Sequence, residues 1–140
     1  MSTELKQRDG ARVPDMRLEL VPVPVSDVEH AKIFYEEKIG FHLDHDVQPS
    51  DTMRVVQLTP PGSACSIVIG TGMGEISAMK PGSVKGLHLV VRDIRQVREI
   101  LAGRGVAVGE IVEYPDGIKY VAFNDPDGNS WTLQEIPDNL

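Results

Sequence analysis

The sequence predicts an α+β fold made of two tandem βαβββ modules. The first observation is a run of apolar residues at helical spacing that begins directly after Ser26 and Asp27. Short alternating apolar runs, separated by Pro- and Gly-containing turns, stand before and after that helix. The same order returns with a second helix start at Asp93, which lies 66 positions after Asp27. We therefore expect a cupped, partly closed mixed sheet around a cleft, with the helices on the outside.

Size, charge and cysteine content exclude several classes of protein. The chain has 140 residues, which suits one domain with its own core. Its net charge is −7 and its basic residues are scattered, which argues against a nucleic-acid partner. A disulfide scaffold is excluded because Cys65 is the single cysteine, and this fits a reducing, cytoplasmic location. No apolar run reaches the roughly 20 residues of a membrane span, so no membrane partner is expected.

The first module follows a polar N-terminal stretch. Residues 1–17 lack an apolar period and are expected to form a flexible arm. Residues 18–25 alternate as a strand, and their two prolines predict an edge position. Ser26 and Glu29 form a capping-box pattern in which the serine caps the helix, and Gly40 provides a left-handed stop. Three further strands are predicted at 41–47, 53–59 and 64–70.

The second module repeats this order after a glycine-rich linker, Gly70 to Ser83. Residues 86–91 form its first strand, Asp93 opens its helix and Gly105 ends that helix. Three more strands complete the module, and we place them at 106–114, 118–124 and 130–136.

Strand alternation predicts which side chains line the cleft. A helix covers one face of each sheet and leaves the other bare, so two modules can enclose a shared cavity between their bare faces. His88 lies on the cleft side of its strand and is the candidate for acid–base or substrate-binding chemistry. The other predicted cleft residues are Leu20, Pro22, Arg54, Ser66, Val68, Val90, Tyr120, Thr132 and Gln134.

The segment HLDHD, His42 to Asp46, has the composition of a metal site. Alternation places His42, Asp44 and Asp46 on one face and turns His45 to the other. We interpret the segment as a solvated strand face, because charged and polar residues are mostly exposed to water.

Three segments together resemble the glyoxalase/bleomycin resistance/ring-cleaving dioxygenase superfamily, also called vicinal oxygen chelate proteins. They are VSDVEHAKIFYEEKIGF, GLHLVVRDI and FNDPDGNSWTLQEI. The resemblance covers about Leu18 to Pro137 and implies one domain over 18–137, with modules at about 18–70 and 84–137. It also implies a small-molecule cleft, often with a divalent metal, and a homodimer.

The resemblance further implies where a metal would be bound. Metal-using relatives place His or Glu on the first and last strand of each module, facing the cleft. The matching positions here are Leu20, Ser66, Gly86 and Thr132, none of which is a usual ligand for Zn, Fe, Mn or Ni. We therefore expect no family metal centre and no cofactor. A divalent metal stays possible only through His88 with Gln134 or Glu135.

Two functions remain open from the sequence. The first is a metal-free protein that binds and sequesters a small organic molecule, as bleomycin-resistance-like relatives do. The alternative is a metal-dependent lyase, isomerase or dioxygenase of the same superfamily that uses His88. The absence of a ligand quartet favours the first.

Overall fold

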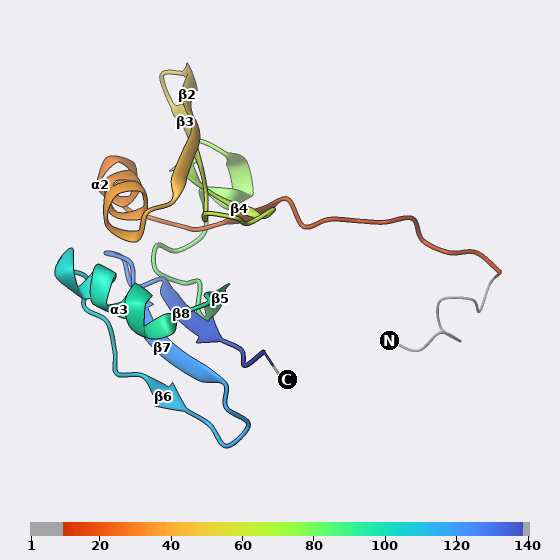
Figure 1. The fold of residues 1–140 in the computed structure, drawn as a ribbon. Coiled ribbons are helices and arrows are strands. Elements are labelled where there is room, and N and C mark those ends of the chain that lie inside the picture. Colours follow the sequence, from red (N-terminus) through yellow and green to blue (C-terminus); the bar gives the residue numbers. More distant parts are fainter. Residues whose placement is uncertain (1–9, 139–140) are drawn as a thin grey trace.

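The structure is a computed structural model that describes residues 10–138. Residues 1–9 and 139–140 lie outside the described part, so the expected flexible arm is covered only from residue 10, where the chain is extended and exposed (Figure 1). The first module contains β1 (Leu20–Pro22), α2 (Val28–Ile33) continuing into the π-helix η1 (Phe34–Ile39), β2 (His42–Ser50), β3 (Met53–Thr59) and β4 (Ser66–Thr71). After the 3-10 turn η2 (Gly74–Ile76), the second module contains β5 (Leu87–Val90), α3 (Ile94–Gly103), β6 (Val112–Glu113), β7 (Lys119–Asn124) and β8 (Ser130–Glu135).

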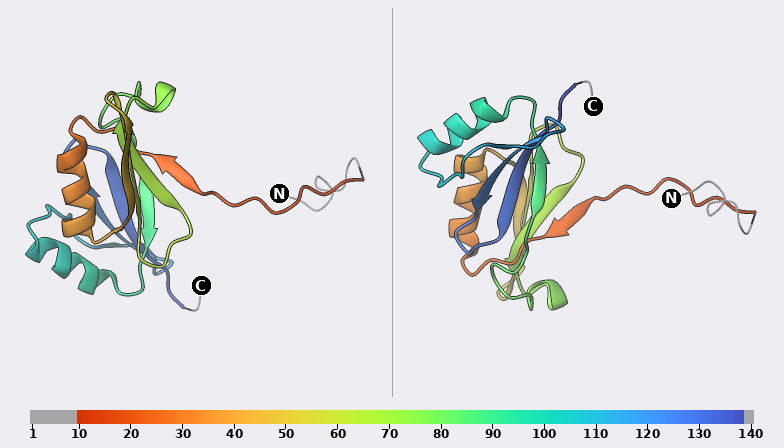
Figure 2. Two further views of the ribbon diagram at one scale, coloured as in Figure 1. Left: turned by 90° about the horizontal axis from the view of Figure 1, so that it is seen from above. Right: turned by 90° about the horizontal axis from the view of Figure 1, so that it is seen from below.

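The predicted fold class is confirmed as two four-stranded mixed sheets. Their strand orders are β1-β4-β3-β2 and β5-β8-β7-β6, and in each sheet the first strand runs parallel to the last strand of its module. β1 lies at an edge, as its prolines predict. Figure 2 shows both helices on the same side of the two sheets, while residues 10–19 run out on the opposite side. Each sheet therefore keeps one face free of helices, which we call its open face.

The helix boundaries agree with the sequence, but the first cap is a different residue. The Asp27 carboxylate accepts a hydrogen bond from the His30 N–H at 3.0 Å, and Asp93 does the same for Gln96 at 3.1 Å. The expected capping by Ser26 is wrong, because its hydroxyl donates to Asp127 at 2.6 Å instead. Gly40 ends the π-helix with a φ of 93°, as predicted.

One hydrophobic core is shared by both modules. It contains Tyr35 and Phe41 from the first module and Phe123 and Trp131 from the second, all at most 3% exposed. The Tyr35 ring contacts Phe41 at 5.5 Å and Trp131 at 5.7 Å between centroids. The helix of the first module is thus packed against the last strand of the second.

The turn of sequence Asp-Pro-Asp-Gly-Asn, residues 125–129, joins the modules through buried hydrogen bonds. Asp125 accepts from the Tyr35 hydroxyl at 2.7 Å and from the Asn129 amide at 2.8 Å. Asn129 also donates to the Pro24 carbonyl at 2.8 Å. The Tyr35 oxygen accepts from the Trp131 indole at 2.9 Å, so the network closes in the centre of the core. Burial of the Tyr35 hydroxyl raises the pKa of Tyr35 well above its usual range.

Two strands differ from the predicted ones. The strand expected at 106–114 is reduced to Val112–Glu113 with an isolated bridge at Val108, and beside that bridge the Gly109 carbonyl accepts from the Arg98 guanidinium at 2.7 Å. In β2 the pairing register shifts between Leu43 and His45, which is the mark of a β-bulge. Strict alternation therefore fails in β2.

The bulge also changes the faces assigned to charged residues. Asp46 pairs in register with the core residue Val56 and lies on the helix side, where Lys32 of α2 donates to it at 2.9 Å. Arg54, expected in the cleft, also lies on the helix side, but for a different reason, because it stands two residues before the core residue Val56 in the regularly paired strand β3. It binds Asp46 at 2.7 Å and Glu29 of α2 at 2.8 Å, so this prediction is corrected.

No helix within residues 10–138 has the length and apolar character needed to cross a membrane.

Candidate ligand-binding site

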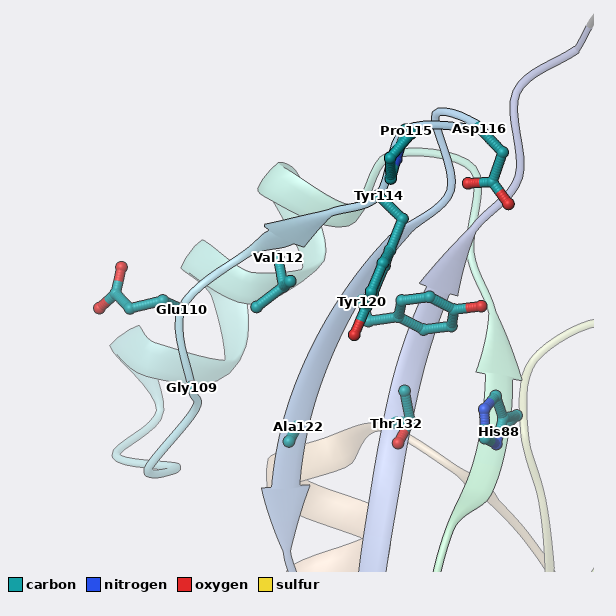
Figure 3. A pocket seen from close by; sticks show the side chains of 10 residues that line it. All are labelled: His88, Gly109, Glu110, Val112, Tyr114, Pro115, Asp116, Tyr120, Ala122 and Thr132. Carbon is teal, nitrogen blue, oxygen red and sulfur yellow. The ribbon is translucent and has the colours of Figure 1, made fainter.

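A cavity of about 940 Å³ opens on the second sheet. Its floor is made by Thr132 and Ala122, with His88 on one side and Tyr120 and Tyr114 above them (Figure 3). The lining is mainly apolar and aromatic, its polar groups include His88, Thr132 and the carboxylates of Glu110 and Asp116, and its volume lies within the range of small-molecule sites.

Strand register explains why these side chains share a face. His88 of β5 is paired with Thr132 of β8, which is paired with Ala122 of β7. Tyr120 lies two residues from Ala122 and therefore points to the same side. This is the open face, because Val121 and Phe123, on the alternate positions of β7, are buried in the core.

Two tyrosines and a histidine form the aromatic wall of the cavity. Tyr120 meets Tyr114 edge to face at a centroid distance of 5.5 Å and His88 at 6.2 Å. Tyr114 is held by a tight turn, in which its N–H donates to the Ile118 carbonyl and its carbonyl accepts from Gly117. Gly117 has a φ of 89°, which a side chain would strain. Tyr114 remains 52% exposed and is therefore available to a ligand.

The His88 ring is oriented by the backbone. Its Nδ1 lies 2.7 Å from the Gly86 carbonyl, and because a carbonyl only accepts, Nδ1 carries the hydrogen. In the neutral ring Nε2 then holds a lone pair and can accept a hydrogen bond from a ligand hydroxyl or N–H. The Thr132 hydroxyl beside it can donate or accept.

The predicted cleft residues are divided between the two sheets. His88, Tyr120 and Thr132 line the cavity together. Val90 and Gln134 lie on the same face in the next row, and Gln134 donates to the Tyr120 oxygen at 3.4 Å. The remaining members occupy the first sheet, where Leu20 pairs with Ser66 and Pro22 with Val68, and they do not line this cavity.

Tyr114 lines the cavity but was not among the predicted cleft residues. The residue stands in a segment expected to be strand, and the signal for its actual position is the Tyr-Pro-Asp-Gly sequence of a turn. Ser66 and Val68 were expected to line the cleft, yet they are buried, with only 5% and 3% of their surface exposed.

The donor set does not fit the family's metal centre. The register brings Leu20 beside Ser66 and His88 beside Thr132, so these strand pairs provide one imidazole and no carboxylate. Across residues 10–138 no group of three His, Cys, Asp or Glu side chains is placed to hold a metal ion. We therefore derive no chemical step through a metal.

The sequence profile of the Glyoxalase/Bleomycin resistance protein/Dioxygenase superfamily matches residues 17–133. The chain belongs to this superfamily. The vicinal oxygen chelate resemblance identified from the sequence is thereby confirmed. None of the curated proteins compared with this superfamily member matches it.

Solved structures of similar proteins agree with this assignment. TnmS3, an antibiotic binding protein from Streptomyces sp. CB03234, is 37% identical with a TM-score of 0.78, over 90% of this chain and 100% of that one. A glyoxalase/bleomycin resistance protein from the same Streptomyces is 40% identical, with a TM-score of 0.71 over 84% of this chain and 98% of that one. A superfamily member from Sphaerobacter thermophilus is 32% identical, with a TM-score of 0.76 over 88% and 99% of the two chains.

Proposed function

We propose that this superfamily member binds a small aromatic organic molecule on the open face of its second sheet, without a resident metal. The observation that carries the proposal is the cavity of about 940 Å³ with its wall of Tyr114, Tyr120 and His88. Such a wall offers flat apolar surface for a ring system, and the His88 Nε2 and the Thr132 hydroxyl offer hydrogen bonds that orient it.

The nature of the similar proteins supports a binding role. TnmS3 is described as an antibiotic binding protein, and it is aligned over its whole length with 90% of this chain. An antibiotic with a conjugated ring system fits the size and the aromatic lining of the cavity. We therefore propose sequestration of such a compound as the biological role. We also propose that the protein acts in the cytoplasm.

The open shape of the cavity favours a homodimer. Its lining comes from the second module alone, which leaves the side opposite the sheet open to solvent. The open face of the first sheet carries Leu20, which is 36% exposed, and Pro22. We propose that two copies pair so that the open face of the first sheet in one copy covers the cavity of the other.

Ligand titration of matched variants tests the binding proposal. A panel of polycyclic aromatic antibiotics is screened by thermal shift, since a ligand of the folded state raises the melting temperature, and hits are titrated by calorimetry. Tyr114→Ala is expected to weaken binding by about tenfold, from the loss of one aromatic contact of about 1.5 kcal/mol. The matched control is Ile100→Ala on the outside of α3, a side chain that is 45% exposed and does not line the cavity.

Two results would count against the proposal. One is equal loss of affinity in Tyr114→Ala and Ile100→Ala, which would place the ligand elsewhere. The other is stoichiometric metal in the purified protein that is lost in His88→Ala, which would support the alternative function of a metal-dependent enzyme. Sedimentation of the unliganded protein as a monomer at all concentrations would reject the homodimer alone.

A further inference from the structure

A row of hydrogen-bonded polar side chains crosses the open face of the first sheet. Ser66 of β4 lies 2.6 Å from the Thr59 hydroxyl of β3, and Thr59 in turn bonds to Asp44 of β2. Gln57 bridges Ser66 and Asp44 at 3.3 Å to each. His42 ends the row, with its Nδ1 2.9 Å from the second Asp44 oxygen. We call these five residues the polar row.

The bulge in β2 is what completes the row. Its register shift lies between Leu43 and His45, so the Asp44 side chain meets Thr59 and Gln57 although Asp46, two residues later, faces α2. Without the bulge Asp44 and Asp46 would share a face.

The hydrogens in the polar row have one consistent arrangement. An ionised carboxylate only accepts, so Thr59, Gln57 and the His42 Nδ1 all donate to Asp44. Thr59 has no second hydrogen, so the Ser66 hydroxyl donates to Thr59. Both hydrogens of the Gln57 amide are taken as well, by Asp44 and Ser66. The hydrogen-bonding positions that stay free in the row are therefore lone pairs, and Nε2 of the neutral His42 ring provides a further one.

The row also carries a negative charge without a Lys or Arg partner. Among the ion pairs of residues 10–138, Asp46 is paired with Lys32 and Arg54, whereas Asp44 is paired only with a histidine. Its hydrogen bond from Thr59 is the main cause that lowers the pKa of the Asp44 carboxyl, so it is ionised at neutral pH. The Asp44 side chain keeps 25% of its surface exposed and His42 keeps 76%.

We propose that the polar row is a binding subsite for a protonated amine of the ligand. An ammonium group brings donors and no acceptor, which matches a surface that has only lone pairs and one uncompensated carboxylate. The proposal rests on the proposed function, because in the proposed homodimer the open face of the first sheet, which carries the polar row, covers the aromatic cavity of the other copy and so meets the amine of the ligand bound there. The ligand class is then an aromatic compound with a basic nitrogen.

A small probe tests the subsite apart from the aromatic cavity. Full-length, isotope-labelled protein is titrated with ethanolammonium chloride, with sodium chloride at equal concentration as reference, and the His42 ring and Gln57 amide signals are followed by NMR. We expect saturable shifts at the polar row, and at least about tenfold weaker binding in Asp44→Asn, because one charge-assisted contact is lost. Asp51→Asn is the matched control, since it removes the same charge from the exposed turn between β2 and β3.

The outcomes separate this proposal from the function itself. Shifts spread evenly over surface carboxylates, or equal affinity in Asp44→Asn and Asp51→Asn, would overturn the subsite whatever the aromatic cavity binds. Binding of an aromatic ligand with the same affinity with and without its amine would overturn it too, while leaving the aromatic site intact. Localised shifts lost only in Asp44→Asn, together with tighter binding of an aromatic ligand when it carries its amine, are the result expected. Melting temperatures of both variants confirm that they are folded.

Discussion

Replacing Tyr35 by Phe would remove one oxygen atom from the centre of the shared core. The hydroxyl donates to Asp125 at 2.7 Å and accepts from the Trp131 indole at 2.9 Å. Since Phe fills nearly the same volume, the substitution leaves the packing of the ring almost unchanged. Its effect on stability therefore reports on the two hydrogen bonds.

The expected loss is about 3 kcal/mol. A hydrogen bond to a charged group contributes about 1.5–3 kcal/mol, and leaving a buried indole N–H without a partner costs about 1–3 kcal/mol. We take the lower part of the sum because Asp125 keeps donors from Asp127 and from Asn129. With an unfolding entropy of about 2.1 cal/mol/K per residue, a loss of this size lowers the melting temperature by about 10 °C.

Urea unfolding of Tyr35→Phe and the parent protein measures this loss. Tyr114→Phe is the matched control, because it removes the same atom from a side chain that is 52% exposed, and it should change stability by less than about 0.5 kcal/mol. A loss below about 1 kcal/mol in Tyr35→Phe would refute the reasoning. It would show that the buried network is not a main source of stability at the module junction.

The same residue predicts an alkaline limit of stability. Burial raises the pKa of Tyr35 in the folded state above the value of about 10 that it has when unfolded. Above that pH the unfolded chain loses a proton that the folded chain keeps, so stability falls by up to about 1.4 kcal/mol per pH unit. The parent protein should therefore lose stability faster than Tyr35→Phe above about pH 10. Parallel slopes in urea titrations would contradict this.

Two further substitutions test other parts of the fold. Asp46→Asn should cost about 1–2 kcal/mol at neutral pH, since Arg54 and Lys32 lower the pKa of Asp46 and their side chains are 21–25% exposed. Because that pKa is lower when folded than unfolded, the difference from the parent should shrink as the pH falls below about 4, and a constant difference in acid would argue against the ion pairs. Gly82→Ala should destabilise more than Gly62→Ala by at least about 1 kcal/mol. Both glycines have a φ near 80°, but a Cβ on Gly82 would lie 2.1 Å from the Asp127 carbonyl, and similar melting temperatures would contradict this reasoning.

The sequence predicts the fold well because its signals are local and occur twice. The Asp93 helix start, the glycine stops and the edge prolines each have a physical cause within a few residues, and the structure places them as expected. The first helix starts where predicted, although Asp27 caps it in place of Ser26. What local patterns miss is the partner of Ser26, whose hydroxyl bonds to Asp127 from the other module, 101 positions away.

The site is less predictable for two physical reasons. The bulge in β2 depends on how neighbouring strands pair, and alternation along one strand does not contain it. Arg54 does follow the alternation of β3, where it shares a face with Val56 and Leu58, and the cleft prediction assigned it to the wrong face. Tyr114 reaches the cavity through a turn, where face assignment by a period of two does not apply. By contrast His88, Tyr120 and Thr132 lie in regular strands, and there alternation places them together.

Because of the buried contacts of the 125–129 turn, we expect neither module to fold without the other. Either half alone would expose part of the shared core, Tyr35 and Phe41 in one case and Phe123 and Trp131 in the other. A chain cut in the linker between β4 and β5 should therefore yield fragments that fold only when mixed. In this protein the repeat that is visible in the sequence is not the unit of folding, so deletion of either module should unfold the other.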